Sequence, residues 1–126
     1  MDTTEKGTFM KLKSLWLACL LAVGFLGSAA PAVAAEVHLF VRHEVADYAT
    51  WRKSYDAFHV TQHKLGVVAQ AVYQSTDNPN DVTVTHTFRS LDKAKAFVAS
   101  AELKSAMEKA GVKGPPQIWF TTRSAK

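Results

Sequence analysis

The amino-acid sequence predicts an α+β domain in which four antiparallel strands form a sheet and two helices cover one of its faces. Stretches rich in Val, Leu and Phe have the two-residue period of a strand, and other segments have the 3.6-residue period of a helix. These segments follow one another in the order strand, helix, strand, strand, helix, strand. Clusters of Gly, Pro, Asn and Asp separate several of them, as expected for turns.

The first 35 residues are predicted to be a cleaved signal peptide rather than part of the fold. Lys11 and Lys13 precede an apolar run from residue 15 to 26, and small residues ending in Ala-Val-Ala-Ala follow it. The run is shorter than the roughly 20 apolar residues that span a membrane, so no stable membrane anchor is expected after cleavage. The sequence therefore predicts an exported bacterial protein, periplasmic or secreted, whose mature domain is residues 36–126.

The first half of the mature domain is predicted to form strand, helix and strand. Residues 36–45 are the first strand, and residues 67–75 are the second. Asp47 is a favourable N-cap for the helix between them, and Gly66 is a favourable residue to end it. One side of this helix is a largely aromatic stripe that consists of Tyr48, Trp51, Tyr55, Phe58 and Gln62.

The second half is predicted to form strand, helix and strand after a turn at residues 76–81. In residues 82–88 every second side chain is Thr, and the side chains between them are Val, Val, His and Phe. This strict alternation indicates a strand in a sheet with two different faces. Ser90 caps a second helix, which residues 100–111 either continue or restart. Residues 117–122 are a short final strand.

A β-α-β-β-α-β order in a chain of this size is typical of the ferredoxin-like arrangement. Two helices cover only one face of such a sheet. The other face cannot be wholly polar, because Phe40 lies on the opposite side of the first strand from Leu39 and Val41. A second copy packed face to face would bury it, so a homodimer is expected.

Composition excludes several classes of function. The formal net charge is +4, but the basic residues are scattered, so nucleic acid is not an expected partner. The single cysteine, Cys19, lies in the predicted signal peptide, which leaves the mature domain without a thiol or disulfide. No phosphate-binding loop, dinucleotide-binding glycine pattern, Ser-His-Asp order or pair of catalytic carboxylates is recognisable.

The segments VRHEVADYATWRKSYD and VTVTHTFRSLDKAKAFVASAELKSAMEKAGVKGPP resemble the dimeric α/β-barrel superfamily. Within it, the similarity is to small antibiotic-biosynthesis-monooxygenase-like or cyclase-like proteins, and it extends over residues 37–122. The most specific matches are His43, Asp47 and Trp51 with their neighbours, and the ending AMEKAGVKGPP. The resemblance implies a homodimer with a pocket in each protomer. It does not imply one activity, because the superfamily includes cofactor-independent oxygenases of polycyclic phenols, haem-degrading oxygenases, isomerases, cyclases and proteins without a known reaction.

Histidines are the most informative candidate functional residues, and all five lie in the mature domain. His43 ends the first strand, where it could act as a general base or as a hydrogen-bond donor to a phenol, or simply close the corner by bonding Asp47 or Trp51. His86 shares a strand face with apolar residues and is the second catalytic candidate. A pocket with both His38 and His86 is possible, but a register change of one residue would separate them. The residues predicted to bind the ligand are His38, Arg42, Trp51, Tyr55, Phe58, His59 and Trp119.

His59 and His63 are four residues apart and therefore share a helix face, which is a spacing that can hold a metal ion. No third ligand or cysteine is nearby in the sequence, and a solvated helix flank is the simpler explanation of the pair. The sequence therefore predicts no metal site and no cofactor.

Two functions are compatible with these features. The first is an exported enzyme resembling cofactor-independent monooxygenases or cyclases, in which His43 or His86 removes a proton from an aromatic or polyketide-like ligand. The second is a non-catalytic envelope protein that binds a hydrophobic ligand, haem or a divalent metal.

Overall fold

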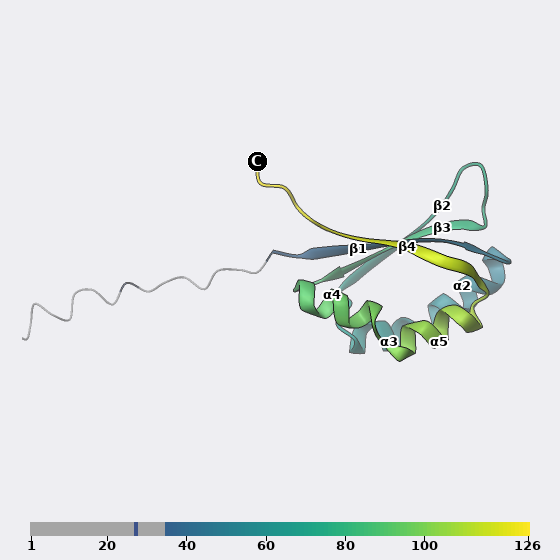
Figure 1. The fold of residues 1–126 in the computed structure, drawn as a ribbon, viewed down its shortest axis with the longest axis horizontal. Coiled ribbons are helices and arrows are strands. Elements are labelled where there is room, and N and C mark those ends of the chain that lie inside the picture. Colours follow the sequence, from purple (N-terminus) through teal and green to yellow (C-terminus); the bar gives the residue numbers. More distant parts are fainter. Residues whose placement is uncertain (1–26, 28–34) are drawn as a thin grey trace, which may run out of the picture. The chain divides into compact units, whose positions relative to one another are not determined.

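The computed structural model describes residue 27 and residues 35–126, so nearly all of the predicted signal peptide, including Cys19, lies outside the described residues. The domain is a single antiparallel sheet with its helices on one face (Figure 1). Its strands lie in the order β2-β3-β1-β4, which confirms the predicted ferredoxin-like fold. No helix among the described residues is long and apolar enough to cross a membrane. The elements are β1 (Val37–Val45), α2 (Tyr48–Ala57), α3 (His59–Lys64), β2 (Ala69–Gln74), β3 (Asp81–Phe88), α4 (Leu91–Val98), α5 (Ala101–Lys109) and β4 (Val112–Thr122).

Each predicted helix consists of two shorter helices. Asp47 caps α2 as expected, since its carboxylate accepts a hydrogen bond from the Thr50 N–H at 2.8 Å. Phe58 separates α2 from α3, and its N–H contacts two carbonyl groups of the preceding turn. Ser100 caps α5 by accepting from the Leu103 N–H at 3.2 Å, so the second helix restarts there rather than continuing.

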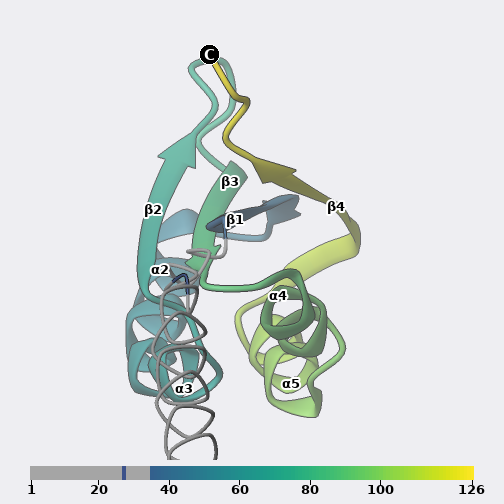
Figure 2. The ribbon, with the colours of Figure 1, turned by 90° about the vertical axis from the view of Figure 1, so that its left-hand side faces the viewer.

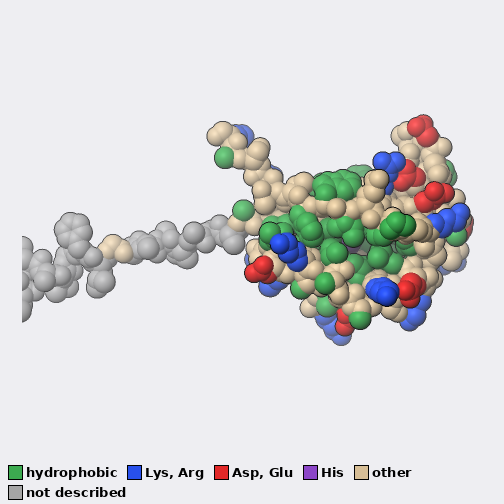
Figure 3. All heavy atoms as spheres, viewed as in Figure 1, with side chains coloured by type: hydrophobic (Ala, Val, Ile, Leu, Met, Phe, Trp, Pro, Cys, Tyr) green, Lys and Arg blue, Asp and Glu red, His purple; other side chains and the backbone are tan. Residues whose placement is uncertain are grey.

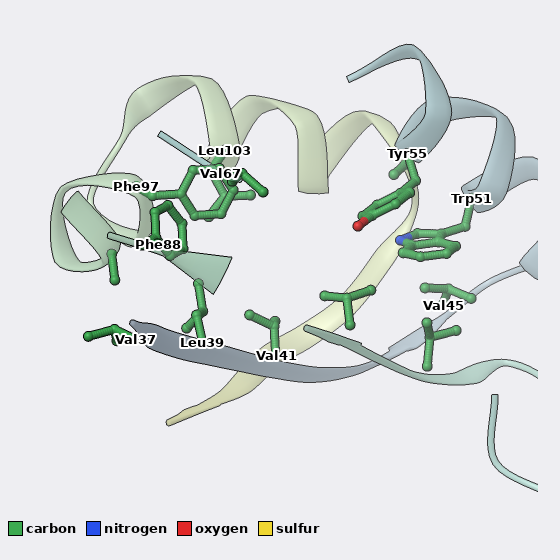
Figure 4. Packing of buried hydrophobic residues seen from close by; sticks show 14 residues of the cluster. Val37, Leu39, Val41, Val45, Trp51, Tyr55, Val67, Phe88, Phe97 and Leu103 are labelled. Atoms are coloured by element: carbon green, nitrogen blue, oxygen red, sulfur yellow. The ribbon is translucent and has the colours of Figure 1, made fainter. Parts of the chain in front are cut away.

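The core lies between the sheet and the helices (Figure 4). Alternate residues of β1 and β3 point toward the helices, so that Leu39 and Phe88 are completely buried. Phe97 of α4 packs on Phe88 with their ring centroids 5.3 Å apart, and Trp51 of α2 covers the other end of the sheet. Burial of side chains of this size contributes about 1.5–3 kcal/mol each and fixes the helices on this face.

The last strand begins earlier than predicted, at Val112 instead of residue 117. The sequence Gly-Pro-Pro normally ends a strand, because proline cannot donate a backbone hydrogen bond. β4 is an edge strand, and Gly114 adopts a left-handed backbone with φ of 66°. An irregularity at the edge of the sheet therefore accommodates residues that a central strand would exclude.

This irregularity lies opposite His43. Arg42 pairs with Gln117, whereas Glu44 pairs with Lys113, so β4 contains two more residues than β1 over this interval. The extra residues interrupt the ladder beside one of the two predicted catalytic histidines.

The opposite face of the sheet carries no helix (Figure 2). Phe40 and Trp119 stack on this face with their centroids 5.2 Å apart, and the Trp119 side chain is 41% exposed. Tyr73 on β2 is also exposed there. The homodimer that would cover these aromatic rings remains a prediction.

Candidate functional site

A cavity of about 40 Å³ lies between the sheet and the helices. Its walls come from β1, β3 and β4 on one side and from α2 to α5 on the other. Most of the lining is apolar, and Phe97, Leu103 and Met107 belong to it. The polar side chains of the lining are His43, Ser54, Tyr55, Gln62 and His86.

His43 is a buried imidazole without a hydrogen-bond partner. Its side chain reaches the cavity from the helix-facing side of β1, and neither ring nitrogen is bonded. The ring lies against Trp51 at a centroid distance of 5.7 Å. Burial lowers the pKa of His43, and the negative charge of Asp81 partly opposes that shift. His43 is therefore a neutral base at physiological pH, and it can accept a proton from a bound molecule.

His86 and Tyr55 form the second polar feature of the cavity. The Tyr55 hydroxyl lies 3.1 Å from Nε2 of His86, and Nδ1 of His86 is buried without a partner. Burial, together with a smaller effect of the nearby His43 charge, lowers the pKa of His86 to about 4. Burial also raises the pKa of Tyr55 to about 12, against an opposing hydrogen bond from Gln62. Both side chains are neutral at pH 7.

The contact with Tyr55 links the tautomer of His86 to the direction of the hydrogen bond between them. The raised pKa of Tyr55 keeps its hydroxyl protonated, so this hydroxyl can donate to Nε2 of His86. A neutral imidazole that accepts at Nε2 carries its proton on Nδ1. His86 therefore presents a buried N–H donor, while His43 presents a free acceptor. The arrangement can remove a proton from one atom of a ligand and stabilise negative charge on another.

Aromatic rings complete the walls of the cavity. Trp51 and Tyr55 stack at 4.9 Å along α2, as Figure 4 shows. Phe97 lies 5.2 Å from the His86 ring and 6.5 Å from Phe58. These rings exclude water from the imidazoles and offer stacking surfaces for an aromatic ligand.

His43 also lines a second, polar hollow of about 340 Å³ at the irregular part of β4. Arg42, Glu44, Asp81 and Lys113 belong to this hollow. His43 therefore lies between a buried apolar cavity and an open polar one. A proton accepted in the cavity has a short route to solvent.

The structure brings five of the predicted site residues together and separates the other four. His43, His86, Trp51, Tyr55 and Phe58 line the cavity. The predicted functional role of each remains untested. The remaining predicted residues, His38, Arg42, His59 and Trp119, lie outside the cavity.

His38 and His86 do not share a pocket, because His86 pairs with Leu39 and thus lies on the opposite sheet face from His38. His38 contacts the Thr87 hydroxyl at 3.0 Å on the uncovered face. On the same face, Arg42 forms an ion pair with Asp81 at 2.6 Å.

Sequence reasoning did not identify Gln62 as a site residue. Gln62 is only 1% exposed and its Oε1 atom has no partner. The available signal was its position in the aromatic stripe, because a polar residue on a buried helix face needs a polar partner. The Tyr55 hydroxyl is near enough for Gln62 to lower the pKa of Tyr55.

No group of three or more His, Cys, Asp or Glu side chains within residues 35–126 is arranged to hold a metal ion.

Several solved structures share this fold. A protein from Bordetella bronchiseptica, proposed to be an antibiotic biosynthesis monooxygenase, superposes with a TM-score of 0.64 at 14% identity, over 72% of this chain and 99% of its own. SnoaB, a cofactor-independent oxygenase from Streptomyces nogalater, has a TM-score of 0.62 at 14% identity, over 74% and 97%. The monooxygenase ActVA-Orf6 of Streptomyces coelicolor, solved with nanaomycin D, has a TM-score of 0.56 at 23% identity, over 74% and 91%.

No protein-family model and no curated protein sequence matches the chain. At these identities the structural similarity establishes the fold alone. The fold is the one found in antibiotic-biosynthesis-monooxygenase-like proteins.

Proposed function

We propose that this protein is an exported cofactor-independent oxygenase, or a related cyclase, of a hydroxylated aromatic or polyketide-like compound. The observation that supports the proposal most is the pair of buried imidazoles, each with an unpartnered nitrogen, in an otherwise apolar cavity. Buried polar groups are normally bonded, and a catalytic role is one of the explanations for a group that is not. The chemistry of similarly folded oxygenases is consistent with this interpretation.

In this proposal His43 is the general base. Its neutral ring accepts the proton of a ligand hydroxyl, and burial among aromatic rings brings the ligand oxygen close without competing water. The Nδ1–H of His86 donates a hydrogen bond to the negative charge that develops on the ligand or on oxygen. Tyr55 positions His86 by donating to its Nε2 atom.

The resulting aryloxide supplies the electrons that reduce oxygen. It transfers one electron to O₂, and the aryloxyl radical and superoxide then join to form a C–O bond at a ring carbon that bears hydrogen. The peroxide takes the proton held by His43, loses the ring hydrogen with the distal oxygen as water, and leaves a carbonyl group. For a phenol the balance is ArH(OH) + O₂ → quinone + H₂O, in which the ligand is the only reductant.

A ligand of this class requires the cavity to widen. A cavity that binds one benzene ring has a volume of about 150 Å³, whereas the present cavity has about 40 Å³. Met107 of α5 and Ile118 of β4 form its wall at the edge of the sheet, and Ile118 is 36% exposed. Figure 3 shows hydrophobic side chains gathered between the sheet and the helices on this side of the molecule. Rotation of the flexible Met107 side chain would open the cavity there.

The predominantly apolar lining of the cavity supports a second candidate function. A non-catalytic envelope protein that holds a hydrophobic molecule needs an apolar cavity but no base. Such a protein would bind the same ligands without converting them.

Export and dimerisation belong to the same proposal. The basic, apolar and small-residue regions of residues 10–35 support export. The stacked pair of Phe40 and Trp119 on the uncovered sheet face supports a homodimer, since a second sheet would remove both rings from water.

The proposal is tested with 1-naphthol as a probe and ¹⁸O₂ as the oxygen source. We expect 1,4-naphthoquinone with one ¹⁸O atom, and a loss of rate of at least about 100-fold in His43→Ala, which is typical of removing a general base. His38→Ala is the matched control, because it removes an imidazole of the same strand from the other sheet face. Binding of naphthol without conversion would favour the second candidate function. Equal rates in His43→Ala and the unchanged protein would refute the assigned base.

A further inference from the structure

We propose that His59 and His63 form a binding site for a divalent transition-metal ion on the outer surface of α3. The two residues lie outside the cavity lined by His43 and His86, and both are exposed to solvent. The proposal is therefore independent of the proposed enzymatic function.

The two imidazoles already have nearly the spacing of a chelating pair. Their Nε2 atoms lie 3.0 Å apart, and their rings meet edge to face with an interplanar angle of 86°. Metal–nitrogen bonds of about 2.0–2.1 Å place two nitrogens about 2.8–3.0 Å apart at the right angle of a square or octahedral ion, and about 3.3–3.4 Å apart at the tetrahedral angle of zinc. An ion that replaced this hydrogen bond would lie to one side of the line between the two nitrogens. Each ring would therefore turn until its Nε2 lone pair points at the ion, while the spacing between the nitrogens would change by only about a few tenths of an ångström.

Gln70 of β2 provides the supporting contact behind this pair. Its side-chain amide lies 2.8 Å from Nδ1 of His59. A histidine that binds metal through Nε2 usually donates its other N–H to an oxygen. The amide oxygen and nitrogen of glutamine exchange places in a half-turn. After that turn, Oε1 of Gln70 accepts from the Nδ1–H of His59, and the lone pair of Nε2 points toward the metal.

The donor set determines the class of metal. Two neutral imidazoles suit Zn²⁺, Co²⁺, Ni²⁺ and Cu²⁺, whereas Mg²⁺ and Ca²⁺ require oxygen ligands. Within residues 35–126 no third His, Cys, Asp or Glu joins the pair. Water would fill the remaining positions, and the ion would link α3 to β2 through His59 and Gln70.

The test is calorimetric titration of the purified protein, without a polyhistidine tag, with ZnCl₂. We expect one Zn²⁺ per chain, no binding of Mg²⁺, and loss of the Zn²⁺ signal in His59→Ala and in His63→Ala. His38→Ala is the matched control and should bind Zn²⁺ as the unchanged protein does, because its imidazole lies on the uncovered sheet face. Thermal unfolding without metal verifies that each variant is folded.

Variants of Gln70 test the supporting contact in opposite directions. Gln70→Ala should weaken Zn²⁺ binding about tenfold, as loss of such a partner usually does. Gln70→Glu should strengthen it, because a carboxylate can only accept from His59. Absence of saturable Zn²⁺ binding, or equal binding in His63→Ala, would overturn the proposed site. Weaker binding in Gln70→Glu would overturn the role given to Gln70.

Discussion

The stability of the domain should fall between pH 7 and pH 4.5 because His86 is held neutral in the folded state. Burial lowers the pKa of His86 to about 4, whereas in an unfolded chain it is near 6.5. Below pH 6.5 the unfolded state therefore binds a proton that the folded state does not bind. Stability contributed by this group is present above pH 6.5 and is lost as the pH falls toward 4.

The magnitude follows from the two pKa values. Their difference corresponds to about 3.4 kcal/mol when the pH is well below 4, and about 2.4 kcal/mol of this is already lost between pH 7 and pH 4.5. His43 adds to the loss, because burial lowers its pKa as well. The paired carboxylates of Asp47 and Asp81 have pKa values below 3.8, so most of their effect appears at lower pH.

The assay is urea unfolding of the unchanged protein and His86→Gln at pH 7, 5.5 and 4.5. Glutamine does not titrate in this range, and its amide can still accept the hydrogen bond of Tyr55. We expect the free energy of unfolding of the variant to fall by about 2 kcal/mol less than that of the unchanged protein over this interval. The carboxylates of Asp47 and Asp81 contribute equally to both proteins and cancel in this comparison. The same pH dependence in both proteins would show that His86 is protonated in the folded domain, and the reasoning would be refuted.

Three further predictions concern the fold and its assembly. Phe88→Ala should lower the free energy of unfolding in urea by about 3–5 kcal/mol, because the ring is fully buried against Phe97. A loss below about 1 kcal/mol would contradict this packing. Gly66→Ala should lower the free energy of unfolding by about 1–2 kcal/mol, because Gly66 has a φ of 101° that other residues adopt only with strain. Unchanged stability would show that this turn rearranges freely. Trp119→Lys should convert a dimer into a monomer in native mass spectrometry, because it places a charge on the uncovered sheet face; an intact dimer in the variant would move the interface elsewhere.

The fold was predictable because its strands alternate clearly. The strict pattern of β3 places His86 on the same face as Val84 and Phe88, where the structure has it. The turn and cap residues were equally informative, since Asp47 caps its helix and Gly66 has a left-handed backbone. Each of these signals acts within a few residues of the chain.

The composition of the site could not be predicted from such local signals. Whether His38 or Leu39 lies opposite His86 depends on the register between two strands that are far apart in the sequence. A shift of one residue moves every side chain of a strand to the other face of the sheet. The early start of β4 was missed because Gly-Pro-Pro ends most strands but is tolerated at an irregular edge. The contact between Gln62 and Tyr55 likewise depends on how α2 and α3 pack, which the helical period alone does not determine.

The most direct test of the account is ¹⁵N NMR of the histidine rings at pH 7, with and without 1-naphthol. The account predicts neutral rings for His43 and His86, with the proton of His86 on Nδ1. Addition of naphthol should shift the ring nitrogens of His43 and the Nδ1–H of His86, and leave those of His38 unchanged. A charged His86, a proton on its Nε2 atom, or naphthol shifts confined to His38 would contradict the claim that two neutral imidazoles face a ligand in this cavity.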